Sequence, residues 1–167
     1  SERLSLYRSE YPNSEGQRYI ESRGVSAEVQ DEFQIGWCPH GTKEGDRYDS
    51  FCGRVIFPVF DTFSELVGFG GRALEEGSTA KYLNSSESEH YKKSRILYGL
   101  DKTQDYVLKS GFAVVVEGYL DVISLWQAGI KNVVASSGTS LSVSQIRLLK
   151  RFSDYVVLCY DGDKAGI

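Results

Sequence analysis

The sequence predicts an α/β fold, of α+β type over the whole chain, in which a small mixed subdomain of helices and a β-hairpin precedes a parallel β–α–β–α–β sheet. After Gly111, apolar strand-like segments alternate with helix-like segments, whereas two Val/Ile/Phe-rich stretches flank a polar turn before it. The later strands are continuously apolar, which is typical of a parallel sheet covered by helices on both faces. We therefore predict two domains, residues 1–110 and 111–167.

The first predicted element is a helical segment from Glu15 to Phe33 in two pieces. Gly24 is a plausible end for the first helix, because glycine readily adopts the left-handed conformation found after helix ends. Ser26 can cap the second helix with its side-chain oxygen. This part of the chain is predicted to be a small helical lead-in.

A β-hairpin is predicted from Arg54 onwards, where RVIFPVF and ELVGFGGRAL flank the turn Asp-Thr-Phe-Ser. Pro58 should lie at an edge or bulge, since it has no N–H group to donate. Residues 75–110 are polar and irregular, and they are predicted to form surface loop and short helix.

The predicted β–α–β–α–β unit reads FAVVVEG, DVISLWQAGI, NVVASSG, LSVSQIRLLKRF and YVVLCYDGD. Ser142 and Gln145 have the spacing of a capping box at the start of the second helix. In such sheets, ligands bind beyond the carboxyl ends of the strands. Glu117 follows the first strand, and Asp161 and Asp163 follow the third, so we expect the three carboxylates to meet if these strands are neighbours.

Gathered carboxylates repel one another unless they share a proton or a cation, and Mg²⁺ or Mn²⁺ is the natural resident of an all-oxygen site. Asp161 and Asp163 can face the same ion, because alternate residues of an extended chain point to the same side. Gly118 and Gly162 leave room for a phosphate or a metal shell to approach the backbone. Asp121 either reinforces this site or caps its helix.

The composition is that of an ordinary globular protein, with 41% hydrophobic and 25% charged residues. No apolar run approaches the roughly 20 residues that span a bilayer, and the first residues lack the apolar core of a secretory signal. We therefore expect a cytoplasmic protein without membrane contact. The net charge of −4 disfavours nucleic-acid binding by bulk charge, so any such contact must be local.

The cysteines Cys38, Cys52 and Cys159 form neither an even set nor a CxxC pair, which argues against a disulfide framework and a ribbon-type zinc site. A zinc site formed by Cys38, Cys52, His40 and His90 is an alternative. Its spacing fits no standard ligand pattern, so ordinary structural roles are favoured.

EGYLD followed by DGD resembles the TOPRIM domain of primases, topoisomerases, recombination-mediator proteins and some nucleases. Taken alone, an acidic residue at the end of a strand is often only a helix cap, and a DxD motif also occurs in phosphatases and glycosyltransferases. SGTSLS and the upstream segments RVIFPVFD, VGFGGRAL, KYLNS and KKSRILYGL are similar to those of bacterial-type (DnaG) primases. The rival interpretations are another TOPRIM enzyme, either a nuclease or a topoisomerase-like protein, and a non-catalytic nucleic-acid-binding fragment.

The resemblance implies DNA-templated synthesis of RNA primers from ribonucleoside triphosphates by two-metal nucleotidyl transfer. It implies that Glu117 is a catalytic acid, base or ligand and that Asp161 and Asp163 are metal ligands, with Mg²⁺ or Mn²⁺ as the cofactor. The implied template- and nucleotide-binding residues are Arg54, Arg72, Lys81, Asn84, Lys92 and Lys93. Arg72 could instead be a solvated charge at a hairpin end, and the lysine pair an ordinary exposed loop.

The implied partners are single-stranded DNA template, the RNA primer and a replicative helicase that binds through regions outside this chain. The chain also departs from the family. The link GTKEGDR is shorter than the usual helical stretch, and the sequence stops at DKAGI. We therefore expect a chain truncated within the family's catalytic domain.

Overall fold

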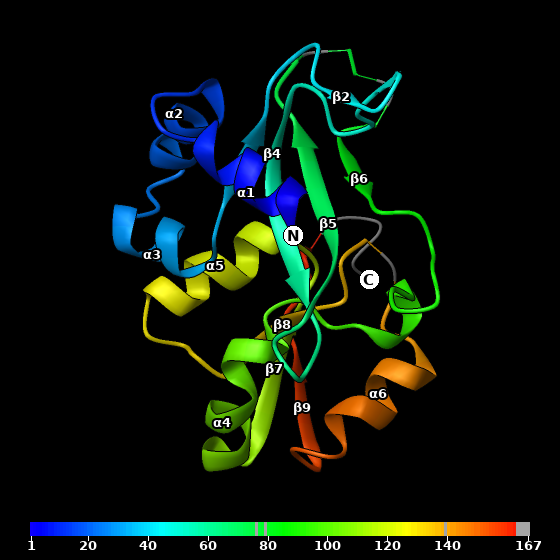
Figure 1. Cartoon of the computed structure of the whole chain (residues 1–167). Coiled ribbons are helices and arrows are strands. Elements are labelled where there is room, and N and C mark those ends of the chain that lie inside the picture. Colours follow the sequence, from blue (N-terminus) through cyan, green and yellow to red (C-terminus); the bar gives the residue numbers. More distant parts are fainter. Residues whose placement is uncertain (76, 79, 139, 163–167) are drawn as a thin grey trace. The chain divides into compact units, whose positions relative to one another are not determined.

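A computed structural model of the chain describes all residues except 76, 79, 139 and 163–167 (Figure 1). The chain divides into two compact units. The first unit comprises Ser1–Pro58 and Gly68–Ser85, and the second comprises Val59–Val67 and Ser86–Ile167. The expected domain boundary at residue 110 stays a prediction.

Three short helices begin the first unit: α1 (Glu2–Ser9), α2 (Glu15–Ser22) and α3 (Ala27–Glu32). The predicted two-piece lead-in is confirmed. Gly24 follows α2 with a φ of 78°, and the Ser26 side chain accepts a hydrogen bond from the Val29 N–H at the start of α3. The sequence did not reveal α1, because Tyr7 is its one buried residue and the helix has no apolar stripe to recognise.

The main sheet has the strand order β1-β4-β5-β6 and consists of β1 (Gly36–Cys38), β4 (Arg54–Phe60), β5 (Leu66–Ala73) and β6 (Tyr82–Asn84). A small separate pair is formed by β2 (Lys43–Glu44) and β3 (Arg47–Tyr48). The predicted hairpin is present. Asp61 closes its turn by accepting the N–H groups of Phe63 and Glu65. Pro58 was expected at an edge or bulge, yet it lies in β4, which is an inner strand of this sheet; the register with β1 ends at Ile56, two residues before it.

The expectation for residues 75–110 was wrong in one respect, because this segment contains a strand. β6 pairs antiparallel with β5, and Arg72 lies opposite Tyr82. Three residues without alternation gave too short a signal to detect. The same segment contains the 3-10 helix η1 (Lys93–Arg95) and α4 (Leu100–Ser110), which lies between two glycines of positive φ, Gly99 and Gly111.

The predicted β–α–β–α–β unit is confirmed in the second unit. It consists of β7 (Phe112–Val116), α5 (Tyr119–Gln127), β8 (Val133–Ala135), α6 (Val143–Leu149) and β9 (Tyr155–Leu158). The sheet order is β8-β7-β9 and every pairing is parallel. The capping box of Ser142 and Gln145 is also present. β7 is thus the central strand, and all three strands end at the same edge.

The core of the second unit is formed by buried residues from the segment after η1, from α4, from the sheet and from α6: Leu97, Leu100, Val107, Ala113, Val115, Val134 and Leu149. One expectation fails here. β9 was expected to be covered on both faces, yet Tyr155 and Leu158 are 73% and 57% exposed. The reason is position, since β9 lies at an edge of the described sheet and pairs with β7 alone. Among the described helices, none has the length and apolar character needed to cross a membrane.

Candidate active site

Glu117 and Asp161 lie together at the carboxyl edge of the parallel sheet. The backbone N–H of Asp161 donates a 2.9 Å hydrogen bond to Oε1 of Glu117. The pairing of β7 and β9 brings them together, since Val115 lies opposite Leu158 and the N–H of Cys159 continues the ladder to the Val115 carbonyl at 2.8 Å. The expectation that residues 44 positions apart meet is therefore fulfilled for this pair.

The neighbouring strand also contacts Glu117. After β8, the Ser137 N–H donates to the Glu117 carbonyl at 3.2 Å. Ser137 has a φ of 59°, a left-handed conformation that is costly for a residue with a side chain. All three strand ends thus converge on Glu117, whose side chain is half-buried, while Asp161 is exposed.

A third carboxylate from DGD would come from Asp163, which lies outside the described residues. Within the described part of the chain, no group of three or more His, Cys, Asp or Glu side chains is arranged to hold a metal. Asp121 is exposed, and its Oδ2 accepts the Gly118 N–H at 2.9 Å. The structure thus supports the helix-cap interpretation of Asp121, and its role as a metal ligand stays a prediction.

Arg54 lies almost fully inside the first unit, 8% exposed. Its guanidinium donates to the Ala80 carbonyl at 2.9 Å, and it lies 3.4 Å from both the Lys81 carbonyl and Ser78 Oγ. Desolvation by burial lowers the pKa of Arg54 from its ordinary value. Arg54 therefore fixes the loop that carries Lys81, and its direct contact with nucleic acid stays a prediction.

Arg72 and Lys81 line one cavity of about 270 Å³ in the first unit, together with Glu75 and Ser78. Arg72 is fixed in orientation, because its guanidinium lies 4.2 Å from the ring centroid of Tyr19 and also donates to the Ala73 carbonyl. Lys81 is exposed. The cavity thus carries one fixed and one exposed cation.

The remaining predicted contacts are divided between the two units. Asn84 is half-buried in β6, opposite Gly70. In the second unit, Lys92 is exposed just before η1, and the Lys93 N–H donates to Glu87 Oε1 at 3.0 Å.

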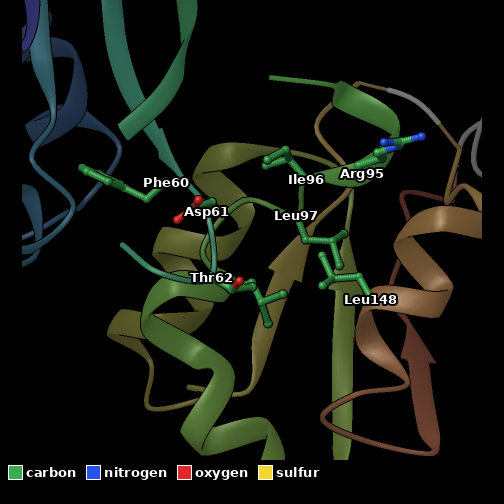
Figure 2. Close-up of a pocket in the computed structure, with 8 residues that line it drawn as sticks. Phe60, Asp61, Thr62, Arg95, Ile96, Leu97 and Leu148 are labelled. Atoms are coloured by element: carbon green, nitrogen blue, oxygen red, sulfur yellow. The ribbon is translucent and has the colours of Figure 1, made fainter. Parts of the chain in front are cut away.

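A second cavity of about 80 Å³ lies in the second unit (Figure 2). Its lining is mainly apolar and includes Phe60, Ile96, Leu97 and Leu148. Figure 2 shows Leu148 of α6 beside Leu97, so the segment after η1 packs against α6. No lining residue belongs to the Glu117–Asp161 pair, and such an apolar cavity offers few groups for a charged substrate.

From the sequence we predicted only a capping role for Gln145, yet its side chain makes further hydrogen bonds in the structure. Its Nε2 donates to carbonyls of Lys93 and Ile96, which lie 52 and 49 positions away. The sequence signal for these bonds is that the capping residue is a glutamine and not a glutamate, since an amide can donate hydrogen bonds as well as accept them.

Comparison with known families agrees with this arrangement. Residues 114–167 match the family described as Toprim-like, and residues 39–104 match the family described as the N-terminal domain of the DNA primase catalytic core. The fold and the strand-end carboxylates therefore define a protein with a Toprim domain. The second match favours a primase over the topoisomerase or nuclease alternatives.

Relatives with known names and structures extend the match. The chain is 36% identical to the DNA primase of Aquifex aeolicus, over 92% of this chain and 36% of that protein, and 40% identical to the DNA primase of Escherichia coli K12, over 89% and 30%. The solved E. coli primase catalytic core superposes with a TM-score of 0.85 at 38% identity, covering 98% of this chain and 61% of that one. The chain belongs to the DnaG-type DNA primase family. It spans about a third of the length of these curated relatives.

Proposed function

We propose that this chain forms part of the catalytic core of a DNA primase, which synthesises short RNA primers on a DNA template during replication. The observation that carries the proposal is the Glu117–Asp161 pair at the carboxyl edge of the sheet, in a chain of this family. The substrates are single-stranded DNA and ribonucleoside triphosphates. A related primase catalytic domain, 39% identical with a TM-score of 0.84, is described as bound to single-stranded DNA, which supports the template assignment.

We propose that Glu117, Asp161 and Asp163 hold Mg²⁺ or Mn²⁺. The donors are those of a hard divalent cation, since Glu117 and the exposed Asp161 both supply carboxylate oxygens and lie at the same strand edge. When bound, such an ion neutralises the charge that develops on a transferring phosphoryl group. The bond from the Asp161 N–H occupies one acceptor position of Glu117, and a carboxylate has about four.

In the proposed reaction, the 3′-hydroxyl oxygen of the growing primer attacks the α-phosphorus of the incoming triphosphate, and pyrophosphate leaves. Glu117 accepts the hydroxyl proton or acts as a ligand, and its hydrogen bonds from the Asp161 and Ser137 N–H groups keep it in place. Asp161 and Asp163 act as metal ligands. The main role that we propose for Asp121 is to cap its helix, and metal binding is its secondary role.

The cations hold phosphates in this proposal. Arg72 and Lys81 face one cavity, so a triphosphate or template phosphate could bridge them, with Asn84 donating from the same segment. Arg54 supports this loop from within the unit. Lys92 and Lys93 add positive charge at the start of η1 in the second unit. We also propose an RNA primer and a replicative helicase as partners, and a cytoplasmic location.

The test is Glu117→Gln in the full natural chain that contains residues 1–167. The amide keeps an oxygen for the Asp161 N–H but removes the charge, so we expect labelled-nucleotide incorporation to fall by at least about a hundredfold with an unchanged melting temperature. Asp154→Asn is the matched control, since this exposed acid lies at the opposite end of β9. Incorporation by the Glu117 variant at the level of the control would refute the proposal.

A further inference from the structure

Gln145 is a fully buried side chain that hydrogen-bonds to three separate segments of the second unit. Its Nε2 donates to the Lys93 carbonyl at 3.0 Å and to the Ile96 carbonyl at 2.8 Å, with the Ser136 carbonyl at 3.4 Å. Its Oε1 accepts the Ser142 N–H at 3.0 Å. One amide therefore uses both its donors and its acceptor inside the unit.

A capping role explains only one of these bonds. A capping box needs a side-chain oxygen that accepts the N–H of the cap residue, and glutamate supplies it as well as glutamine does. The bonds to carbonyls need N–H donors, which glutamate lacks. Gln145 is thus equipped for a task beyond starting α6.

The first segment that Gln145 holds is cationic. We call residues 92–96 the cationic turn, since KKSRI carries three positive charges and no acid. Ser142 strengthens the attachment, because its hydroxyl donates to the Ser94 carbonyl at 2.6 Å. Two side chains at the start of α6, those of Ser142 and Gln145, therefore hold the cationic turn.

The second segment that Gln145 holds leads to the acidic pair. The Ser136 carbonyl directly precedes Ser137, the left-handed residue whose N–H binds the Glu117 carbonyl. A strained residue keeps its conformation only where its neighbours hold it. Lys93 and Ser137 also line one small cavity of about 10 Å³, so the cationic turn and the strand-end loop face each other.

We propose that Gln145 is a positioning residue, which sets the cationic turn at a fixed distance from Glu117 so that Lys93 can meet a nucleotide phosphate. The proposal rests on the proposed function, because it assigns a phosphate to Lys93. Gln145 itself touches no substrate. It acts through the two carbonyls of the cationic turn and the one carbonyl of the strand-end loop.

A first experiment measures the position of the turn without any activity. Trypsin cleaves after lysine and arginine, and we expect the hydrogen bonds from Gln145 to protect the sites after Lys92, Lys93 and Arg95. We expect Gln145→Met to raise cleavage there by about tenfold, the effect of losing hydrogen bonds worth roughly 1.4 kcal/mol. Gln145→Glu should behave likewise, although it keeps the capping oxygen. The control for general destabilisation is Leu149→Ala, a core change in the same helix that leaves the bonds to the Lys93 and Ile96 carbonyls in place, and it should raise cleavage clearly less than Gln145→Met does.

A second experiment measures the effect on substrate in the full natural chain. We expect Gln145→Met to raise the KM for ribonucleotides by about fivefold with kcat nearly unchanged, since it misplaces a binding group and not the chemistry. Lys93→Ala should give a similar rise. The double variant should be no worse than either single one, because both remove the same contact.

Distinct outcomes separate the two proposals. Wild-type protection from trypsin in both Gln145 variants would overturn the positioning role, as would a cleavage increase in Leu149→Ala equal to that in Gln145→Met. Lost protection with an unchanged KM, or additive effects in the double variant, would overturn it too. The proposed function is tested separately, by comparing nucleotide incorporation by the Glu117→Gln variant with that by the Asp154→Asn control.

Discussion

The backbone N–H of Asp161 reaches Oε1 of Glu117 at 2.9 Å, so the segment after β9 is tied to the residue after β7 by the carboxylate of that residue. The bond uses the backbone of Asp161 and leaves the Asp161 carboxylate out of it. The alignment of the two strand ends and the proposed binding of a cation can therefore be separated by mutation.

We predict that Asp161→Asn weakens Mn²⁺ binding by at least about tenfold. Even residues that only hydrogen-bond to a metal ligand change metal affinity by about this much when they are replaced. The asparagine keeps the backbone donor to Glu117, so the melting temperature should hardly change. Titration calorimetry with Mn²⁺ measures the effect, and Asp154→Asn serves as the control. Equal affinities for the two variants would remove Asp161 from the metal site.

The cavity between Arg72 and Lys81 leads to a second prediction. Replacing both residues with alanine should flatten the salt dependence of single-stranded DNA binding, since each lost phosphate contact lowers the log–log slope by about 0.7. The loss of the stacking on Tyr19 should cost about 0.5–1 kcal/mol of stability. Fluorescence anisotropy over a salt series gives the slope. Arg23→Ala with Lys109→Ala removes the same charge from exposed positions, and a similar change there would assign the effect to net charge alone.

Arg54 gives a third prediction, because it is buried and bonded to the loop that carries Lys81. Arg54→Lys keeps the charge but cannot reproduce the forked contacts to the Ala80 and Lys81 carbonyls. We expect a loss of about 1–3 kcal/mol in the free energy of unfolding, together with faster amide exchange at residues 80–82. If exchange there stays as slow as in the unchanged protein, Arg54 does not hold this loop.

A fourth prediction concerns alkaline pH. Burial, assisted by the charge of Glu87, raises the pKa of Tyr91 to about 12, while an unfolded tyrosine ionises near 10. The neutral phenol is favoured in the folded state, so its contribution is complete below pH 10 and is lost as the pH rises towards 12. Over that interval the loss amounts to about 2 kcal/mol.

Urea unfolding at pH 9, 10 and 11 tests this prediction. The unchanged protein should lose stability relative to Tyr91→Phe as the pH rises, because phenylalanine cannot ionise. The pKa values of Tyr7, Tyr11 and Tyr98 are raised by burial as well, and their effect is common to both proteins. Parallel stability curves would show that Tyr91 ionises as easily when folded as when unfolded.

Local patterns in the sequence were enough to predict the parallel unit and the hairpin. Continuous apolar strands, the cap at Ser142 and the turn at Asp61 each depend on residues close together in the chain. The meeting of Glu117 with Asp161 also followed, since adjacent parallel strands end at the same edge.

What the sequence did not reveal depends on distant residues. β6 exists because three residues pair with β5, and Arg54 is buried because a loop 26 positions away covers it. Gln145 resembled a simple cap, and only the folded chain brings carbonyls from about 50 positions away to its amide. A single sequence carries no periodic signal for such pairings.

The exposed strand β9 has a practical consequence for handling the protein. Tyr155–Leu158 presents four large apolar side chains in a row at the edge of the described sheet, a pattern that invites another chain to add a strand. We expect residues 1–167, expressed by themselves, to self-associate as their concentration rises. Val157→Lys should act as a gatekeeper and keep them monomeric in light scattering after size-exclusion chromatography, because a charge on an open edge opposes strand addition.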